Sequence, residues 1–193
     1  DLLDEPRKES HILLAELPEK LREYGMDLSV DPHACLESYM GYQMEADEDP
    51  DADWRMDIIA GSTCCDAIVS GYLEGENDYM DDLHADGAVA GFLCYPLDTL
   101  REEKGSQKIF DFRDRLEEYL GSDCGSDTLI LTGGGTGLYC GYVDFIAWDL
   151  DRALDHAKEY FDDTDIPWAV FHTFRREAGT VGLKSPDEGS LQT

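Results

Sequence analysis

Negative charge constrains what this chain can fold into more than any other feature of its sequence. Asp and Glu total 44 against 15 Lys and Arg, which gives a formal net charge of -29 over 193 residues. Such a chain repels itself when it is compact, unless salt, bound cations or a basic partner offset the repulsion. The same field repels nucleic-acid phosphates and anionic membranes. We therefore expect a basic protein as the partner, no nucleic acid and no membrane.

The acidic excess also has a general explanation. Salt-adapted proteomes carry acidic surfaces on most of their proteins, and net charge affects solubility and association before it affects fold. Lys is scarce here and Asp outnumbers Glu, which fits that origin and a bacterial or archaeal source. Salt adaptation and partner binding both remain open explanations.

The apolar content predicts a folded protein despite the charge. Hydrophobic residues make up 42% of the chain, with ten Tyr, seven Phe and three Trp, whereas disordered chains are poor in both classes. A globule of this length buries roughly 70% of the surface that its unfolded chain exposes. Without an internal repeat or a Ser- or Pro-rich linker, residues 1–193 are expected to form one domain, with 1–10 and 184–193 as flexible ends.

The cysteines point to a reducing compartment. Their spacing matches neither a disulfide scaffold nor a paired CxxC zinc site, and the positions are Cys35, Cys64, Cys65, Cys94, Cys124 and Cys140. The longest apolar run, residues 87–97, is too short to span a bilayer, and no basic and apolar leader opens the chain. We expect a soluble cytoplasmic protein with reduced, mostly buried thiols.

The N-terminal half offers two helices and several ambiguous segments. Apolar residues at helical spacing predict a helix over 11–25, interrupted or restarted at Pro18, and a second helix from Asp31 to Tyr42. Residues 56–73 fit either a strand followed by a helix or one continuous helix. Residues 88–97 fit either a buried strand or a short core helix.

The C-terminal half has a clearer pattern. Residues 110–120 and 150–161 predict amphipathic helices, and residues 128–132, 138–148 and 168–174 predict strands, with a further pairing segment near Gly182. Strands and helices in this order predict an α+β domain, in which a mostly antiparallel sheet is covered by helices on one face. Of the aromatics at 139, 142, 145 and 148, some are expected in the core and some in an exposed binding patch.

A glycine run is the sharpest local feature. Glycine brings backbone N–H groups close to phosphate, so an anion or nucleotide site is one interpretation, and a flexible hairpin connection is the other. The run resembles the phosphate loop of tubulin-like GTPases, although Leu138 and Tyr139 depart from that pattern and the chain is too short for that fold. Its residues are Gly133, Gly134, Gly135, Thr136 and Gly137.

His172, Arg175 and Arg176 are candidate ligand-binding residues together with the glycine run. Their cationic groups suit an anionic ligand. The alternative is structural, with an arginine paired to Asp144 or Asp149 because buried carboxylates need partners.

Two acidic segments are candidate cation sites. Residues 47–58 begin like a calcium loop, but Ala52 stands where that loop needs glycine and Ile58 where it needs the closing glutamate. In the second segment, carboxylates and an imidazole at helical spacing suit a divalent metal, and these candidates are Asp78, Asp81, Asp82 and His84. The alternative for both segments is a solvated acidic surface that binds no cation.

Cys64 and Cys65 are two adjacent thiols. A nucleophilic thiol needs a neighbouring base or cation, whereas the neighbour here is Asp66, so we expect buried small side chains. The sequence names no cofactor and no catalytic constellation. We expect a non-catalytic binding protein, such as an immunity or inhibitor protein that docks on a basic toxin or nuclease. The alternatives are a small-ligand protein or enzyme that uses the glycine run, and a metal-binding protein.

Overall fold

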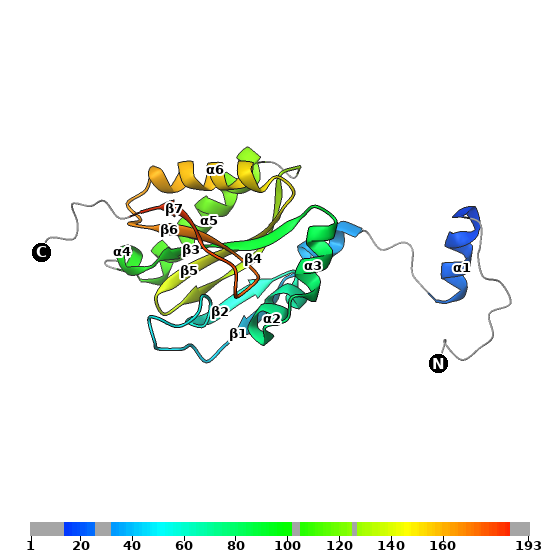
Figure 1. Ribbon diagram of the computed structural model, residues 1–193, viewed down its shortest axis with the longest axis horizontal. Coiled ribbons are helices and arrows are strands. Elements are labelled where there is room, and N and C mark those ends of the chain that lie inside the picture. Colours follow the sequence, from blue (N-terminus) through cyan, green and yellow to red (C-terminus); the bar gives the residue numbers. More distant parts are fainter. Residues whose placement is uncertain (1–13, 26–31, 102–104, 125–126, 186–193) are drawn as a thin grey trace, which may run out of the picture. The chain divides into compact units, whose positions relative to one another are not determined.

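The computed structural model describes residues 14–25, 32–101, 105–124 and 127–185 (Figure 1). The chain divides into two units, residues 1–37 and 38–193, and each is described by itself. The prediction of one domain over 1–193 stays a prediction. The predicted flexible ends lie outside the described residues, except that Lys184 and Ser185 are described and Lys184 ends a strand.

The described residues of the first unit form three short helical segments. A 3-10 turn η1 (Leu14–Glu16) leads into α1 (Leu17–Glu23), where Pro18 occupies the first turn, a position that needs no backbone N–H. A second 3-10 segment, η2 (Pro32–Glu37), follows. The predicted helix through Tyr42 is therefore wrong, because Met40–Gln43 forms an edge strand instead.

The second unit is an α+β domain, as predicted. Its strands are β1 (Met40–Gln43), β2 (Ile58–Thr63), β3 (Val89–Pro96), β4 (Leu129–Gly137), β5 (Cys140–Ala147), β6 (Ala169–Thr173) and β7 (Val181–Lys184). Its helices are α2 (Asp66–Glu74), α3 (Asp78–Ala85), α4 (Asp98–Arg101), α5 (Ser106–Tyr119), the π-helical turn η3 (Leu120–Cys124) and α6 (Leu150–Asp162). Residues 56–73 thus form a strand and a helix, and residues 88–97 form a strand.

The sheet is antiparallel throughout, in the order β1-β2-β4-β5-β3-β6-β7. Its central strands β3 and β5 are buried along almost their whole length. Alternate side chains of a strand point to opposite faces, so an apolar run such as residues 89–96 requires cover on both sides.

Helices accordingly cover both faces of the sheet, rather than one face as the sequence suggested (Figure 1). Leu93 and Tyr95 of β3 pack in a cluster with α5 and α6, which contributes Ala153, Ala157 and Phe161 at intervals of one turn. Phe92 and Cys94 face the opposite side, in a cluster with α2 and α3.

The glycine run forms the second half of β4 and is not the predicted hairpin connection. It pairs with β2 on one side and β5 on the other. A Cβ atom on Gly133, whose φ is +142°, would collide with the carbonyl oxygen of Ser62, and one on Gly134 with that of Tyr142. Glycine is required here because neighbouring backbones approach closely, and the turn itself is made by Leu138 and Tyr139.

Candidate functional site

The most acidic exposed segment of the second unit is the connection between β1 and β2, residues 45–53, which we call the acidic loop. Its six exposed carboxylates belong to Glu45, Asp47, Glu48, Asp49, Asp51 and Asp53. The amide of Asp49 donates to Oδ1 of Asp47 at 2.9 Å, and that of Asp51 to Oδ1 of Asp49 at 3.0 Å. These local bonds are typical of Asx turns, so the carboxylates at alternate positions shape the backbone of the loop.

Arg55 anchors the downstream end of the acidic loop in the core. Its guanidinium forms a two-pronged pair with Asp144 of β5, with Nη1 to Oδ1 at 2.5 Å and Nη2 to Oδ2 at 3.2 Å. Nη2 also donates to the Tyr42 hydroxyl at 2.8 Å. Both charged side chains are fully buried, and the guanidinium lies about 5 Å from the rings of Phe92 and Phe174, within cation–π range.

Burial and the Arg55 charge act in opposite directions on the pKa of Asp144. Burial raises the pKa of the Asp144 carboxyl, and the Arg55 guanidinium opposes that rise. The two parallel hydrogen bonds that join the groups favour the charged form of the pair. Nε of Arg55 is buried without a hydrogen-bond partner among the described residues.

Asp57 fixes the next turn of the chain against the β4–β5 hairpin. Its carboxylate accepts bonds from the Tyr142 hydroxyl at 2.5 Å and from the amides of Tyr139 and Cys140 at 2.9 and 3.0 Å. A Cβ atom on Gly137 would collide with this carboxylate. Burial raises the pKa of Tyr142, so its hydroxyl stays a donor at neutral pH.

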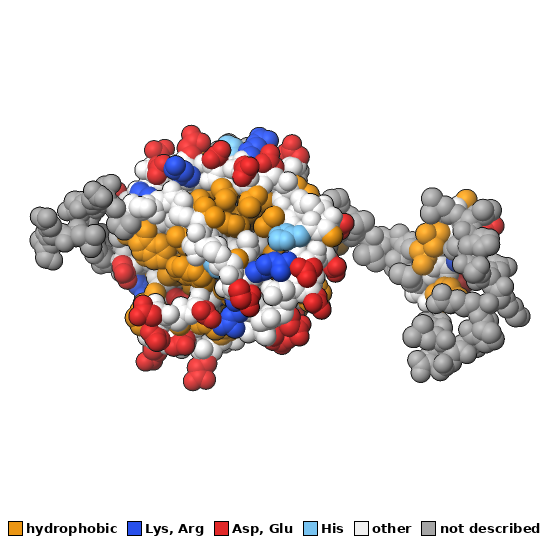
Figure 2. Space-filling view, viewed as in Figure 1, with side chains coloured by type: hydrophobic (Ala, Val, Ile, Leu, Met, Phe, Trp, Pro, Cys, Tyr) orange, Lys and Arg blue, Asp and Glu red, His pale blue; other side chains and the backbone are white. Residues whose placement is uncertain are grey.

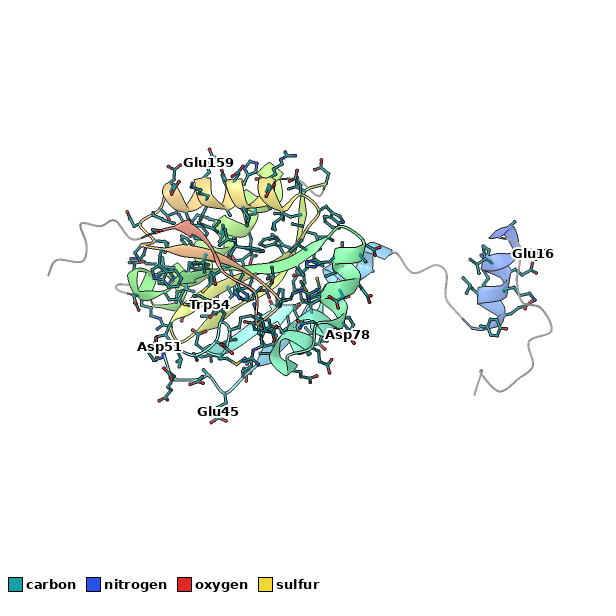
Figure 3. All side chains as sticks on the ribbon, in the orientation of Figure 1. Glu16, Glu45, Asp51, Trp54, Asp78 and Glu159 are labelled. Atoms are coloured by element: carbon teal, nitrogen blue, oxygen red, sulfur yellow. The ribbon has the colours of Figure 1, made fainter. Side chains whose placement is uncertain are left out.

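Three further contacts hold the loop from outside. The Tyr139 hydroxyl donates to the carbonyl of Glu48 at 2.7 Å, the indole N–H of Trp54 donates to Thr180 at 3.3 Å, and Arg176 pairs with Asp53 at 2.7 Å. In Figure 3, Glu45 and Asp51 point away from the sheet, whereas Trp54 lies against the body of the unit. The loop is therefore exposed in its carboxylates and fixed in its backbone.

Helix α3 continues the negative surface. Arg175 pairs with Asp81 of α3, and the neighbouring Arg176 pairs with Asp53 of the loop. Two adjacent arginines thus place both segments at the β6–β7 connection. We call the acidic loop together with Asp78, Asp81 and Asp82 the acidic face. In Figure 2, acidic side chains (red) gather along the lower edge of the second unit. At the top, over α6, acidic and basic side chains (red and blue) alternate.

The candidate metal ligands share α3, and metal binding by them stays a prediction. No group of three or more His, Cys, Asp or Glu in the described residues is arranged to hold a metal ion. Asp81, the candidate between Asp78 and His84, already has Arg175 as its partner. In the calcium-like segment, residues 47–58, two carboxylates likewise already have partners. Asp47 and Asp49 accept hydrogen bonds from the backbone of the loop itself.

The structure separates the glycine run from His172, Arg175 and Arg176. Strands β5 and β3 lie between β4 and β6. The two ring nitrogens of His172 contact the carbonyl oxygens of Thr173 and Ala178 at 2.5 and 2.9 Å. Arg175 and Arg176 do form structural ion pairs, but with Asp81 and Asp53 and not with the predicted Asp144 or Asp149.

A different arginine lies beside the glycine run. A hollow of about 100 Å³ there is lined by Gly133, Gly134 and Ser62 of the sheet and by Arg113 and Glu117 of α5. Nε of Arg113 stands 3.7 Å from Glu117. Burial raises the pKa of Glu117, and Arg113 opposes the rise. Ligand binding by the glycine run stays a prediction.

Four cysteines, Cys64, Cys65, Cys94 and Cys140, take part in no disulfide. Cys94 and Cys140 are buried, as predicted, whereas Cys64 and Cys65 are half-exposed at the start of α2. Burial raises the pKa of Cys94 well above its usual value, which makes that thiol a poor nucleophile.

Sequence reasoning missed Arg55 and Asp57. The signal for Asp144 was present, because it is the one charged residue in the apolar strand 140–147 and was expected to need a partner. The signal for Arg55 was weaker: it is the one cation between Glu45 and Asp57.

The chain matches no protein-family model, no curated protein and no solved structure. In the part of the chain that the structure describes, no helix has the length and apolar character to cross a bilayer. What the fold and the site define is an α+β protein with an anchored acidic face.

Proposed function

We propose that this chain is a non-catalytic binding protein whose acidic face docks on a basic protein. The observation that carries the proposal is the anchoring of the acidic loop by the buried pair of Arg55 and Asp144. A loop that only solvates the surface needs no such anchor. A loop that binds a partner gains affinity from one, because less conformational entropy is lost on binding.

Charge supplies the second support. A net charge of -29 speeds encounter with a positive surface and raises the cost of meeting a negative one. The exposed ring of Tyr139 adds an aromatic contact beside the loop, since its hydroxyl is bonded to Glu48. Aromatic residues are enriched at protein interfaces.

The partner class follows from the same chemistry. A toxin or nuclease that acts on nucleic acid presents a positive, phosphate-binding surface, and an acidic protein that covers this surface blocks it. We place the complex in the cytoplasm, where thiols such as Cys64 and Cys65 stay reduced.

The test compares capture of proteins from a lysate of the source organism by three forms of the full chain. These are the wild type, the acidic-face variant Glu45→Gln/Glu48→Gln/Asp51→Asn, and the control Asp151→Asn/Asp155→Asn/Glu159→Gln on α6. Each variant removes three exposed carboxylates. The three loop side chains form no hydrogen bond or ion pair with a described residue, so the loop backbone is preserved.

The expected result is one basic protein, retained in stoichiometric amount by the wild type and by the α6 control and lost by the loop variant and at high salt. With that protein purified, log Kd should change linearly with log salt concentration, and the loop variant should have the shallower slope. An acidic or neutral partner, equal retention by the loop variant, or no retained protein would contradict the proposal.

A further inference from the structure

A ligand-sized cavity lies on the opposite side of the sheet from the acidic face. Its volume is about 400 Å³, and α4, α5 and the turn after α6 line it. In Figure 1, α4 and the C-terminal end of α6 lie at the same end of the sheet. Small-molecule sites in proteins commonly measure about 300 to 1,000 Å³.

The cavity has an apolar floor. Phe112 of α5 and Ile166 of the α6–β6 turn are buried core residues, and Leu100 and Tyr160 pack against the same core. The Tyr160 hydroxyl is directed to the carbonyl of Phe112 at 3.5 Å, which leaves the ring as part of the wall. Such a floor suits an aliphatic or aromatic group.

One wall carries two cations that have no carboxylate partner among the described residues. Lys108 and Arg115 stand seven residues apart on α5, which places them on the same side of the helix. Neither forms an ion pair with any residue in the described ranges. The Nε atom of Arg115 donates to its own helix, to the carbonyl of Asp111.

The α6–β6 turn supplies carboxylates to the same cavity. Asp163 and Asp165 line it from this turn. The turn is fixed, because Lys184 donates to the carbonyls of Phe161 and Thr164 at 2.8 and 2.7 Å. Asp111 of α5 also lines the cavity, with Gln107 bonded to its carboxylate at 2.6 Å. The cavity therefore offers groups of both signs and an apolar floor.

We propose that this cavity binds a small zwitterion with an apolar body, namely an α-amino acid with a large aliphatic or aromatic side chain. Its carboxylate meets Lys108 and Arg115, its ammonium meets Asp163 and Asp165, and its side chain covers Phe112 and Ile166. A ligand without net charge is not repelled by the -29 field that disfavours simple anions. The site is independent of the proposed function.

The experiment measures binding to the full chain by calorimetry, with L-leucine and L-phenylalanine as probes. Three partial ligands separate the contributions: 4-methylpentanoate lacks the ammonium, 3-methylbutylamine lacks the carboxylate, and glycine lacks the side chain. We expect millimolar or tighter binding of the two amino acids, and a loss of about tenfold or more for each partial ligand.

Variants then locate the site. Lys108→Gln/Arg115→Gln and Asp163→Asn/Asp165→Asn should each weaken L-leucine binding by about tenfold. Arg152→Gln/Lys158→Gln on exposed α6 should leave binding unchanged, and thermal unfolding checks that each variant is folded. Absence of binding at about 10 mM, equal affinity for a partial ligand, or unchanged affinity in a folded cavity variant would overturn the proposal.

Discussion

At the scale of single residues, Arg55 combines two unfavourable features. Its charge is fully buried, and its φ of +73° lies in the left-handed region, which costs a non-glycine residue about 1 to 2 kcal/mol. Both are tolerated because the guanidinium binds Asp144 and Tyr42 and lies near three aromatic rings. The backbone turn at Arg55 is what directs the acidic loop outward while its end stays in the core.

We predict that Arg55→Met lowers the free energy of unfolding by about 3 to 5 kcal/mol, because it leaves the Asp144 charge buried without its partner. Asp144→Asn should have a loss of similar size. The double variant should lose less than the sum, since neither charge then remains. Urea denaturation measures all three, and a loss below about 1 kcal/mol for Arg55→Met would show that the pair does not anchor the loop.

Tyr72 gives a prediction for alkaline pH. Burial raises its pKa to about 12, and its hydroxyl donates to the carbonyl of Trp54 at 3.1 Å. Because the folded pKa exceeds the unfolded value of about 10, the contribution to stability is complete below pH 10 and is lost as pH rises to about 12.

Tyr72→Phe should therefore be less stable than the wild type at neutral pH by about 1 kcal/mol, the value of one hydrogen bond. Between about pH 9 and pH 12 it should lose less stability than the wild type, by roughly 2 to 3 kcal/mol. Urea midpoints over this pH range measure the difference. Parallel curves for the two proteins would mean that Tyr72 ionises normally in the fold.

At the scale of elements, strand β4 shows where sequence patterns succeed and fail. Helices α5 and α6 were predicted within a few residues, because the helical spacing of their apolar side chains is local information. The glycine run was assigned to a turn because glycine favours turns. Its strand conformation depends on β2 and β5, whose carbonyl groups at Ser62 and Tyr142 leave no space for a Cβ atom.

The candidate site divides in the same way. The exposed acidic loop and the need of Asp144 for a partner follow from composition and from one charge in an apolar strand. The partner itself lies 89 residues away in the chain, and nothing local distinguishes Arg55 from Arg175 or Arg176 as that partner. The site therefore depends on a contact between residues far apart in the chain, which only the folded structure reveals.

Glycines in two strands of this sheet should therefore respond differently to the same substitution. Gly134→Ala places a methyl group against the carbonyl of Tyr142, whereas a Cβ atom on Gly182 of β7 meets no atom within 4 Å. We expect Gly134→Ala to lose about 3 kcal/mol or more, or not to fold, and Gly182→Ala to change stability by less than about 1 kcal/mol. Thermal and urea unfolding compare them, and equal stability of the two variants would contradict the close approach of β4 and β5.

At the scale of the whole molecule, the charge is uneven as well as large. The acidic loop has six exposed carboxylates, of which Asp53 pairs with the half-buried Arg176. Helix α6 alternates signs, with Arg152 and Lys158 among Asp151, Asp155 and Glu159. Repulsion is therefore concentrated at the acidic face, where screening by salt should have its largest effect.

We predict that Tm rises by on the order of 5 °C between 10 mM and 1 M NaCl, because the Debye length falls from about 30 Å to about 3 Å and the self-repulsion is screened. The loop variant Glu45→Gln/Glu48→Gln/Asp51→Asn should be more stable than the wild type at low salt and should show a smaller rise. The α6 variant Asp151→Asn/Asp155→Asn/Glu159→Gln should keep most of the rise, because its carboxylates already have cationic neighbours. NaCl and KCl should act equally at equal ionic strength, since screening does not depend on the identity of the cation. Equal behaviour of the two variants would mean that the negative charge acts as a uniform field, and the acidic face would then have no electrostatic character of its own with which to select a partner.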